Sequence, residues 1–103
     1  MKLHELAHAR AGDKGDTTTL SLIPYRDEHY AHLVGEVTAE RVAAHFDGLI
    51  TGAVRRHEVP GLPALCFTLE GALLGGVTIS PGVDPHGKSL SFALLAMDIA
   101  PPA

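Results

Sequence analysis

The stretch ARAGDKGD, residues 9–16, concentrates groups that could bind an anion such as a phosphate or a carboxylate. Its candidate binding residues are two cations, two carboxylates and two glycines: Arg10, Gly12, Asp13, Lys14, Gly15 and Asp16. Guanidinium and ammonium groups pair with anions, and glycines let backbone N–H groups approach a ligand closely. The spacing is not that of a GxxxxGK[ST] phosphate loop. The alternative interpretation is a tight turn, in which the aspartates accept backbone hydrogen bonds and the glycines supply positive φ.

A second stretch of the same character, SPGVDPHGK, occupies residues 80–88 and adds Asp84 and Lys88 as candidate binding residues. If both stretches lie at the same end of a sheet, their carboxylates and ammonium groups form one polar site. Opposite charges at close range favour the ionised form of each group. Taken alone, the second stretch is better interpreted as a solvated turn.

The seven histidines and the single cysteine raise the question of metal or nucleophilic chemistry. His4 and His8 would lie about 13 Å apart on a strand, too far to share one ion. His29 and His32 are three residues apart but belong to no HExxH or HxH pattern. Cys66 lies in the apolar stretch LPALCFTL, where a small buried core residue is the ordinary role. We therefore expect no metal site, no cofactor and no catalytic cysteine.

Length and composition predict one domain spanning residues 1–103, with 46% hydrophobic and 19% charged residues. The formal net charge of -4 argues against a nucleic-acid partner, which would require clustered Lys and Arg. One cysteine cannot form an internal disulfide, and no secretory signal precedes the first strand, so a cytoplasmic location is expected. The longest apolar runs are too short to cross a membrane.

Sequence periodicity and capping residues then predict the elements that would position these groups. Strands are expected at residues 2–9, 17–23, 53–59 and 89–99. Helices are expected at residues 27–34, 38–46 and 63–73. The last of the four strands is apolar on both faces, which indicates burial on both sides or self-association.

This order of elements predicts an α+β protein, a two-layer sandwich in which helices cover one face of a mostly antiparallel, four-stranded sheet. The layout is ferredoxin-like, although the opening pair of strands differs from the plain βαββαβ order. ARAGDKGD would connect the first two strands and lie at one edge of the sheet.

Four blocks in order, ARAGDKGD, TAERVAAHF, PGLPALCFTLEGALLGGVTIS and DPHGKSLSFALL, resemble the small C-terminal ferredoxin-fold domain of the acyclic terpene utilization protein A (AtuA) family. The likeness covers roughly residues 6–99. The family's R(S/A)GDKG(D/N) signature falls on residues 10–16, and its later D-x-x-GK block falls on Asp84, Gly87 and Lys88. The chain departs from the family pattern at Cys66, where Asn is typical, and at Leu74, where a run of glycines is common.

In that family the domain follows a much larger domain or occurs as a separate short protein. The resemblance implies a setting in bacterial catabolism of acyclic terpenes or other branched acids, carried as acyl-CoA thioesters. It does not settle the molecular activity.

Three functions follow as expectations. The first is a small stand-alone subunit that associates with a larger AtuA-like partner and contributes the charged loop to a shared acyl-CoA or carboxylate site. The second is an independent hydratase or lyase, with Asp13 or Asp16 as general acid or base and Lys14 holding an anionic group. The third is a structural oligomerisation module that associates through residues 89–99. A homo-oligomer is expected in each case, because a small apolar chain gains buried core by association.

Overall fold

The computed structural model describes residues 1–14, 17–47, 50, 52–71 and 88–102, and its centre is a four-stranded sheet. The strands are β1 (Ala7–Lys14), β2 (Thr17–Pro24), β3 (Val54–Val59) and β4 (Ala64–Glu70). They lie in the order β1-β2-β4-β3, and every neighbouring pair is antiparallel. The helices are α1 (Tyr30–Glu36), α2 (Ala39–His45) and α4 (Lys88–Leu95), with 3-10 turns η1 (Leu3–Glu5) and η2 (Asp27–His29).

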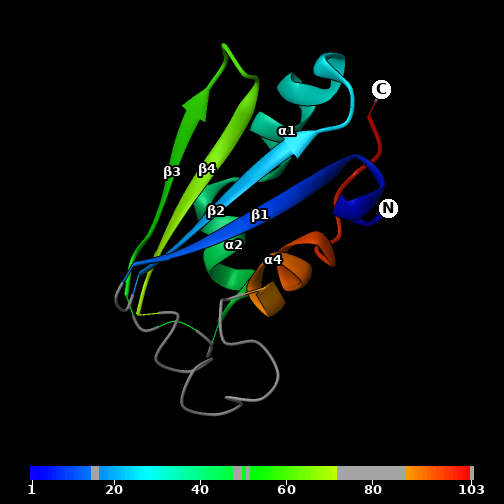
Figure 1. Ribbon diagram of the computed structural model, residues 1–103. Helices are drawn as coiled ribbons and strands as arrows, with labels where there is room; N and C mark the ends of the chain where they lie inside the picture. Colours follow the sequence, from blue (N-terminus) through cyan, green and yellow to red (C-terminus); the bar gives the residue numbers. More distant parts are fainter. Residues whose placement is uncertain (15–16, 48–49, 51, 72–87, 103) are drawn as a thin grey trace.

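The described elements follow one another as two strands, two helices, two strands and a helix (Figure 1). Moving the last strand of a βαββαβ chain to its start produces this ββαββα order, with the first helical step divided here into α1 and α2. The expected α+β, ferredoxin-like class with an antiparallel sheet and helices is thus confirmed. None of the described helices is long and apolar enough to cross a membrane.

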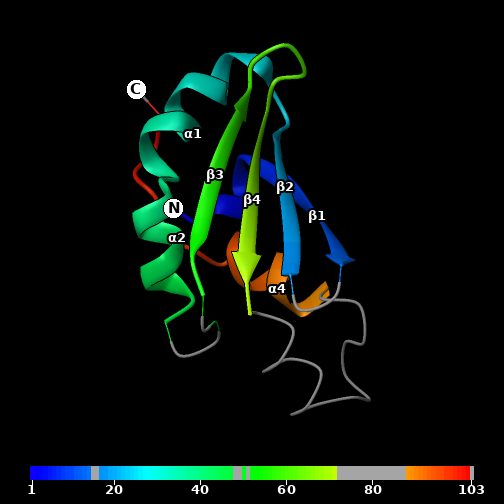
Figure 2. The same cartoon turned by 90° about the vertical axis from the view of Figure 1, so that its left-hand side faces the viewer.

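One face of the sheet forms the core with the helices (Figure 2). Alternate residues of the two central strands are fully buried there, because successive side chains of a strand point to opposite faces. The buried strand residues include Leu20, Leu22, Leu65, Phe67 and Leu69. The helices cover them with the buried side chains of Leu33, Val42, Leu90 and Leu94. Aliphatic residues supply most of this core, as the composition predicts.

The opposite face of the sheet has one buried residue among those described, Ala64, and we call it the open face. Register also places on it His8, Arg10, Gly12, Thr17, Thr19, Ser21, Ile23, Arg55, His57, Val59, Cys66, Thr68 and Glu70. Hydroxyl and charged side chains are frequent in this set. Packing of the described helices therefore uses only one side of the sheet.

The helix expected after the N-cap residue Thr38 is confirmed, and so are its cap and its buried face. The Thr38 side chain accepts a hydrogen bond of 3.1 Å from the backbone N–H of Arg41, which satisfies one free donor of the first turn of α2. Val42 and Phe46, four residues apart, are both buried. The expected stop at Gly48 lies outside the described residues.

The first strand begins later than expected, so most of the ARAGDKGD stretch is strand rather than turn. Residues 2–6 form the turn η1 and its end, where Leu3 and Leu6 are buried three residues apart. β1 then pairs with β2 from Ala7 opposite Pro24 to Lys14 opposite Thr17. Only two residues separate these two strands in the sequence.

The expected helix at residues 63–73 is wrong over its first part, which is strand β4. Leu65 and Leu69 fit a helical stripe as well as an alternating pattern, and Phe67 between them is also fully buried. β4 is the central partner of β2 and β3, and long-range pairing decided its state. The remainder of the expected helix, with Gly75 and Gly76, lies outside the described residues.

The expected last strand at residues 89–99 is also wrong, because its first part is helix α4. Leu90 and Leu94, four residues apart, face the core, while Phe92 is 69% exposed. Met97 and Ile99 are buried after the helix ends. An apolar run without alternation suits a buried helix as well as a strand, and packing against β1 decides between them here.

Candidate functional site

Signature residues 10–14 lie on β1, which is an edge strand of the described sheet. Among them, Arg10, Gly12, Asp13 and Lys14 are consecutive or near neighbours in the last five residues of the strand. An edge strand pairs on one side only, so its other row of backbone N–H and C=O groups lacks a strand partner in the described sheet. The main chain of this part of the signature therefore lies at one border of the described sheet.

Gly12 occupies a position at which the described part of the chain does not require glycine. It lies within β1 without a positive φ, and a Cβ placed on it would meet no atom of the described residues within 4 Å. The sequence-based expectation that this glycine makes a turn is therefore wrong. A glycine inside a strand costs about 0.5–1 kcal/mol relative to alanine. Its use here leaves the backbone open to close approach from outside the described chain.

Arg10 lies next to Gly12 on the open face and is exposed. In the described parts of the chain it makes no ion pair, whereas Arg55, also on this face, lies 3.7 Å from a Glu70 carboxylate oxygen. An unpaired, exposed guanidinium is available to a carboxylate or phosphate. Among the described side chains of the signature, Arg10 is thus the cation that is open to an anionic ligand.

Asp13 and Lys14 end β1 opposite Thr18 and Thr17 of β2. Thr18 is fully buried, and its Oγ1 has no hydrogen-bond partner among the described residues. Lys88, the later candidate, is the first residue of α4, and this helix packs against β1. Gly15, Asp16 and Asp84 lie outside the described residues, so the meeting of the two charged stretches remains a prediction.

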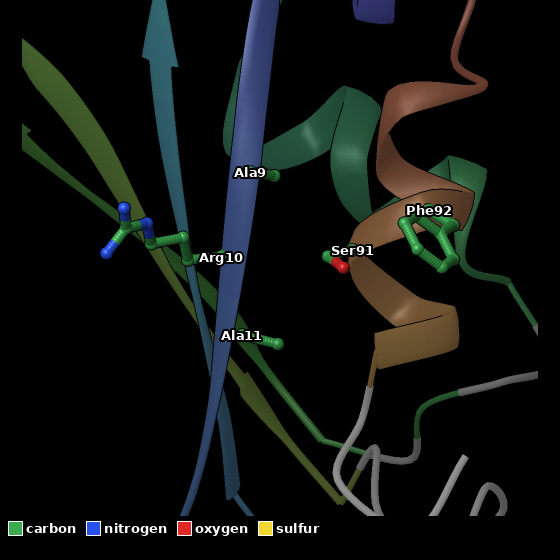
Figure 3. Close-up of a pocket in the computed structure, with 5 residues that line it drawn as sticks. All are labelled: Ala9, Arg10, Ala11, Ser91 and Phe92. Atoms are coloured by element: carbon green, nitrogen blue, oxygen red, sulfur yellow. The ribbon is translucent and has the colours of Figure 1, made fainter.

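A shallow groove of about 460 Å³ runs between β1 and α4 (Figure 3). It is lined by Ala9, Arg10, Ala11, Ser91 and Phe92. Figure 3 shows Ala9 and Ala11 pointing toward α4, while the Arg10 guanidinium extends away from the helix on the other side of β1. The groove is therefore mainly apolar on its sheet side, and the cation lies across the strand from it. Sequence reasoning missed Phe92, because its exposure depends on residues 88–95 being a helix.

The carboxylates with shifted pKa values lie outside the signature. The backbone N–H of Ala100 and the Arg41 guanidinium lower the pKa of Glu36, whose carboxylate accepts from them at 2.8 and 3.1 Å. Lys2 lowers the pKa of Asp98 through an ion pair of 2.9 Å. These contacts hold the end of the chain against α1 and the first residues, which is a structural role.

Cys66 does not lie in the core, contrary to the sequence-based expectation. Register places it on the open face, where it is partly exposed, and its Sγ lies 3.8 Å from Ser21 Oγ. The alternation of β4 sends Leu65 and Phe67 to the core and Cys66 to the opposite side. A helix at residues 63–73 would not have this alternation, so the placement of Cys66 follows from β4 being a strand.

Two histidines are used to fix the helices. His32 Nε2 donates to the carbonyl of Ala100 at 2.6 Å, and His45 Nε2 donates to the carbonyl of Ala93 at 2.5 Å. Among the described residues, no group of three or more His, Cys, Asp or Glu side chains could hold a metal ion.

Residues 1–100 match the family model described as the AtuA ferredoxin-like domain. No curated protein and no solved structure matches the chain.

Proposed function

Because the chain belongs to the AtuA ferredoxin-like domain family, we propose that it is the small subunit of an AtuA-like system in bacterial acyl-CoA catabolism of acyclic terpenes or branched acids. In this role it associates with a larger AtuA-like partner. It contributes the charged, glycine-containing second half of β1 to a ligand site that the two chains share. The ligand class is an acyl-CoA or a carboxylate.

The observation that carries this proposal is Gly12. Neither backbone conformation nor crowding within the described chain requires a glycine at this position of β1. Close approach by a ligand or a partner's backbone gives a physical reason for it. The neighbouring Arg10 has no anionic partner among the described residues, and it is placed to bind the negative charge of such a ligand.

The groove on the other side of β1 from Gly12 and Arg10 is too shallow to enclose a ligand by itself, which supports sharing of the site. Ligand pockets commonly enclose about 300–1,000 Å³ and bury most of a drug-sized molecule. The groove between β1 and α4 is about 460 Å³ but shallow, and Phe92 on its wall is 69% exposed. A CoA-sized ligand would need a second wall, and a larger partner would supply it.

The experiment has two steps. Tagged protein is first recovered from its native cells grown on a branched carbon source, and the larger protein that accompanies it is identified. Binding of isovaleryl-CoA to the purified pair is then measured by calorimetry for wild type, Gly12→Ala and Gly35→Ala. Gly35 is the matched control, because a Cβ there also meets no described atom within 4 Å but the residue lies in α1, away from β1.

We expect Gly12→Ala to weaken binding by about tenfold or more, equivalent to roughly 1.4 kcal/mol, without loss of thermal stability. Gly35→Ala should bind as wild type does and should be slightly more stable, since alanine favours a helix. Unchanged binding by Gly12→Ala would remove β1 from the site. Recovery of the chain without a larger protein would contradict the role of a subunit.

A further inference from the structure

Four polar side chains form a single row across the open face, one from each strand. The register pairs Arg10 of β1 with Ser21 of β2, Ser21 with Cys66 of β4, and Cys66 with His57 of β3. The row therefore runs from a guanidinium through a hydroxyl and a thiol to an imidazole. None of these four residues is buried, and the described helices pack on the other face.

The thiol has two hydrogen-bonding neighbours, Ser21 through a contact and His57 through the strand register. Directly opposite residues of an antiparallel pair have Cβ atoms about 4.5–5.5 Å apart, which applies to Cys66 and His57. Ser21 Oγ lies 3.8 Å from Cys66 Sγ and can donate a hydrogen bond to a thiolate there. Arg10 is two strands from Cys66, about 10 Å away at the usual strand spacing.

Among the described residues, the charge near the row is predominantly positive. Arg10 has no ion pair within that part of the chain, and the imidazole of His57 is exposed. Glu70 is the one carboxylate on this face among the described strand residues, and it pairs with Arg55 at 3.7 Å. Partly exposed thiols in electropositive surroundings are the ones that react, because the thiolate is the nucleophile.

We propose that Cys66 is a site of reversible thiolation by a small disulfide that carries carboxylate groups, such as glutathione disulfide. His57 accepts the proton of the thiol, and Arg10 binds a carboxylate of the incoming molecule. Cys66 Sγ attacks one sulfur of the disulfide, a new S–S bond forms, and the old S–S bond breaks. Cys66 is oxidised to the mixed disulfide, and the other half of the reagent leaves as a reduced thiolate that takes up a proton.

This inference does not depend on the proposed function, since it needs neither a larger partner nor an acyl-CoA. Its reacting atom lies on the central strand β4, whereas the proposed shared site lies along the edge strand β1. Arg10 is common to both, and the test below separates its effect on anion binding from its effect on the thiol.

The test compares two disulfides at neutral pH on the full chain: glutathione disulfide, which is anionic, and bis(2-hydroxyethyl) disulfide, which is neutral. The rate of adduct formation is followed by intact mass, and dithiothreitol reverses it. Cys66→Ser confirms the site. Arg10→Gln and His57→Gln are compared with the matched controls Arg26→Gln and His29→Gln, which lie outside the row. Circular dichroism establishes that each variant is folded.

We expect Arg10→Gln to slow the reaction with glutathione disulfide about tenfold and to leave the reaction with the neutral disulfide nearly unchanged. His57→Gln should slow both reactions, because the proton acceptor is lost, while both control variants should react as wild type does. Equal rates for wild type and both row variants would show an ordinary exposed thiol and overturn the proposal. Absence of any adduct on the folded chain, when the urea-unfolded chain reacts, would overturn it as well.

Discussion

Arg56 shows how one side chain can connect the sheet to a helix. It lies on the core-facing side of β3, and its Nη1 donates to the carbonyls of Val34 and Val37 at 2.6 and 3.0 Å. The last carbonyls of a helix have no partner within the helix, so a cation at this end satisfies them and opposes the helix dipole. Its neighbour Arg55 points to the open face and contacts Glu70 instead.

The adjacent arginines permit a matched test. Arg56→Met should lower the free energy of unfolding by about 1–3 kcal/mol, because two partly buried carbonyls lose a charged donor. Arg55→Met should change it by no more than about 0.5 kcal/mol, since a surface ion pair contributes little. Urea denaturation of both variants measures the difference. Equal effects would mean that the Arg56 contacts to α1 do not stabilise the fold.

At the scale of elements, α4 is the helix that supports the signature strand. It packs against β1 and buries Leu90 and Leu94 in the core, and Phe92 is left on the groove (Figure 3). β1 itself contributes small side chains to this contact, including Ala9 and Ala11, which allow the helix to approach the strand. The position of the signature therefore depends on the burial of one apolar stripe of α4.

Two substitutions in α4 test this arrangement. Leu94→Ala should destabilise the fold by about 2–5 kcal/mol, because it removes a fully buried side chain and leaves a cavity. Phe92→Ala should change the stability by no more than about 0.5 kcal/mol, because Phe92 is exposed. Thermal unfolding of the two variants gives the comparison. If residues 89–99 were instead a strand with two buried faces, both substitutions would be costly.

At the scale of the whole molecule, the two ends of the chain are joined (Figure 1). The amino terminus donates to the carbonyl of Ile99 at 2.9 Å, and the Ile99 N–H donates to the carbonyl of Met1 at 2.8 Å. Ion pairing of Lys2 with Asp98 and the contact of Glu36 with Ala100 hold the same region. Closure of the core beside α1 and α2 therefore depends on carboxylates that must be ionised.

This dependence predicts a loss of stability in acid. The pKa values of Glu36 and Asp98 are lowered in the folded chain from ordinary values of 4.5 and 3.8. A lowered pKa means that the stabilisation is complete above the ordinary value and disappears as the pH falls through the folded value. These two carboxylates should thus leave the melting temperature nearly unchanged between pH 5 and pH 7. At pH values under about 4, the melting temperature should decrease as they become protonated.

Variants identify the groups responsible. Glu36→Gln should melt at a lower temperature than wild type at pH 7, with the difference narrowing as the pH is lowered. Glu28→Gln is the control, because its ion pair with Arg26 is highly exposed and lies on η2. If the melting temperatures of wild type and Glu36→Gln differ by the same amount at every pH, the charge of Glu36 does not contribute to the stability.

The family, the α+β class and the pairing of the first two strands with each other follow from the sequence by itself, because they depend on ordered motifs, local alternation and short connections. Thr38 and its helix follow for the same reason, since a cap acts within one turn. Residues 63–73 and 89–99 were misassigned, because their apolar spacing suits strand and helix alike and only contacts with distant strands select one.

Tertiary structure alone decided which face each polar residue occupies. Cys66 was expected in the core but lies on the open face beside Ser21 and His57, because strand register sets the direction of every side chain. Gly12 was expected in a turn but lies within an edge strand of the described sheet, with no described atom near its Cβ position. Sequence spacing lists the groups that can act, whereas pairing of strands far apart in the chain decides which of them are neighbours.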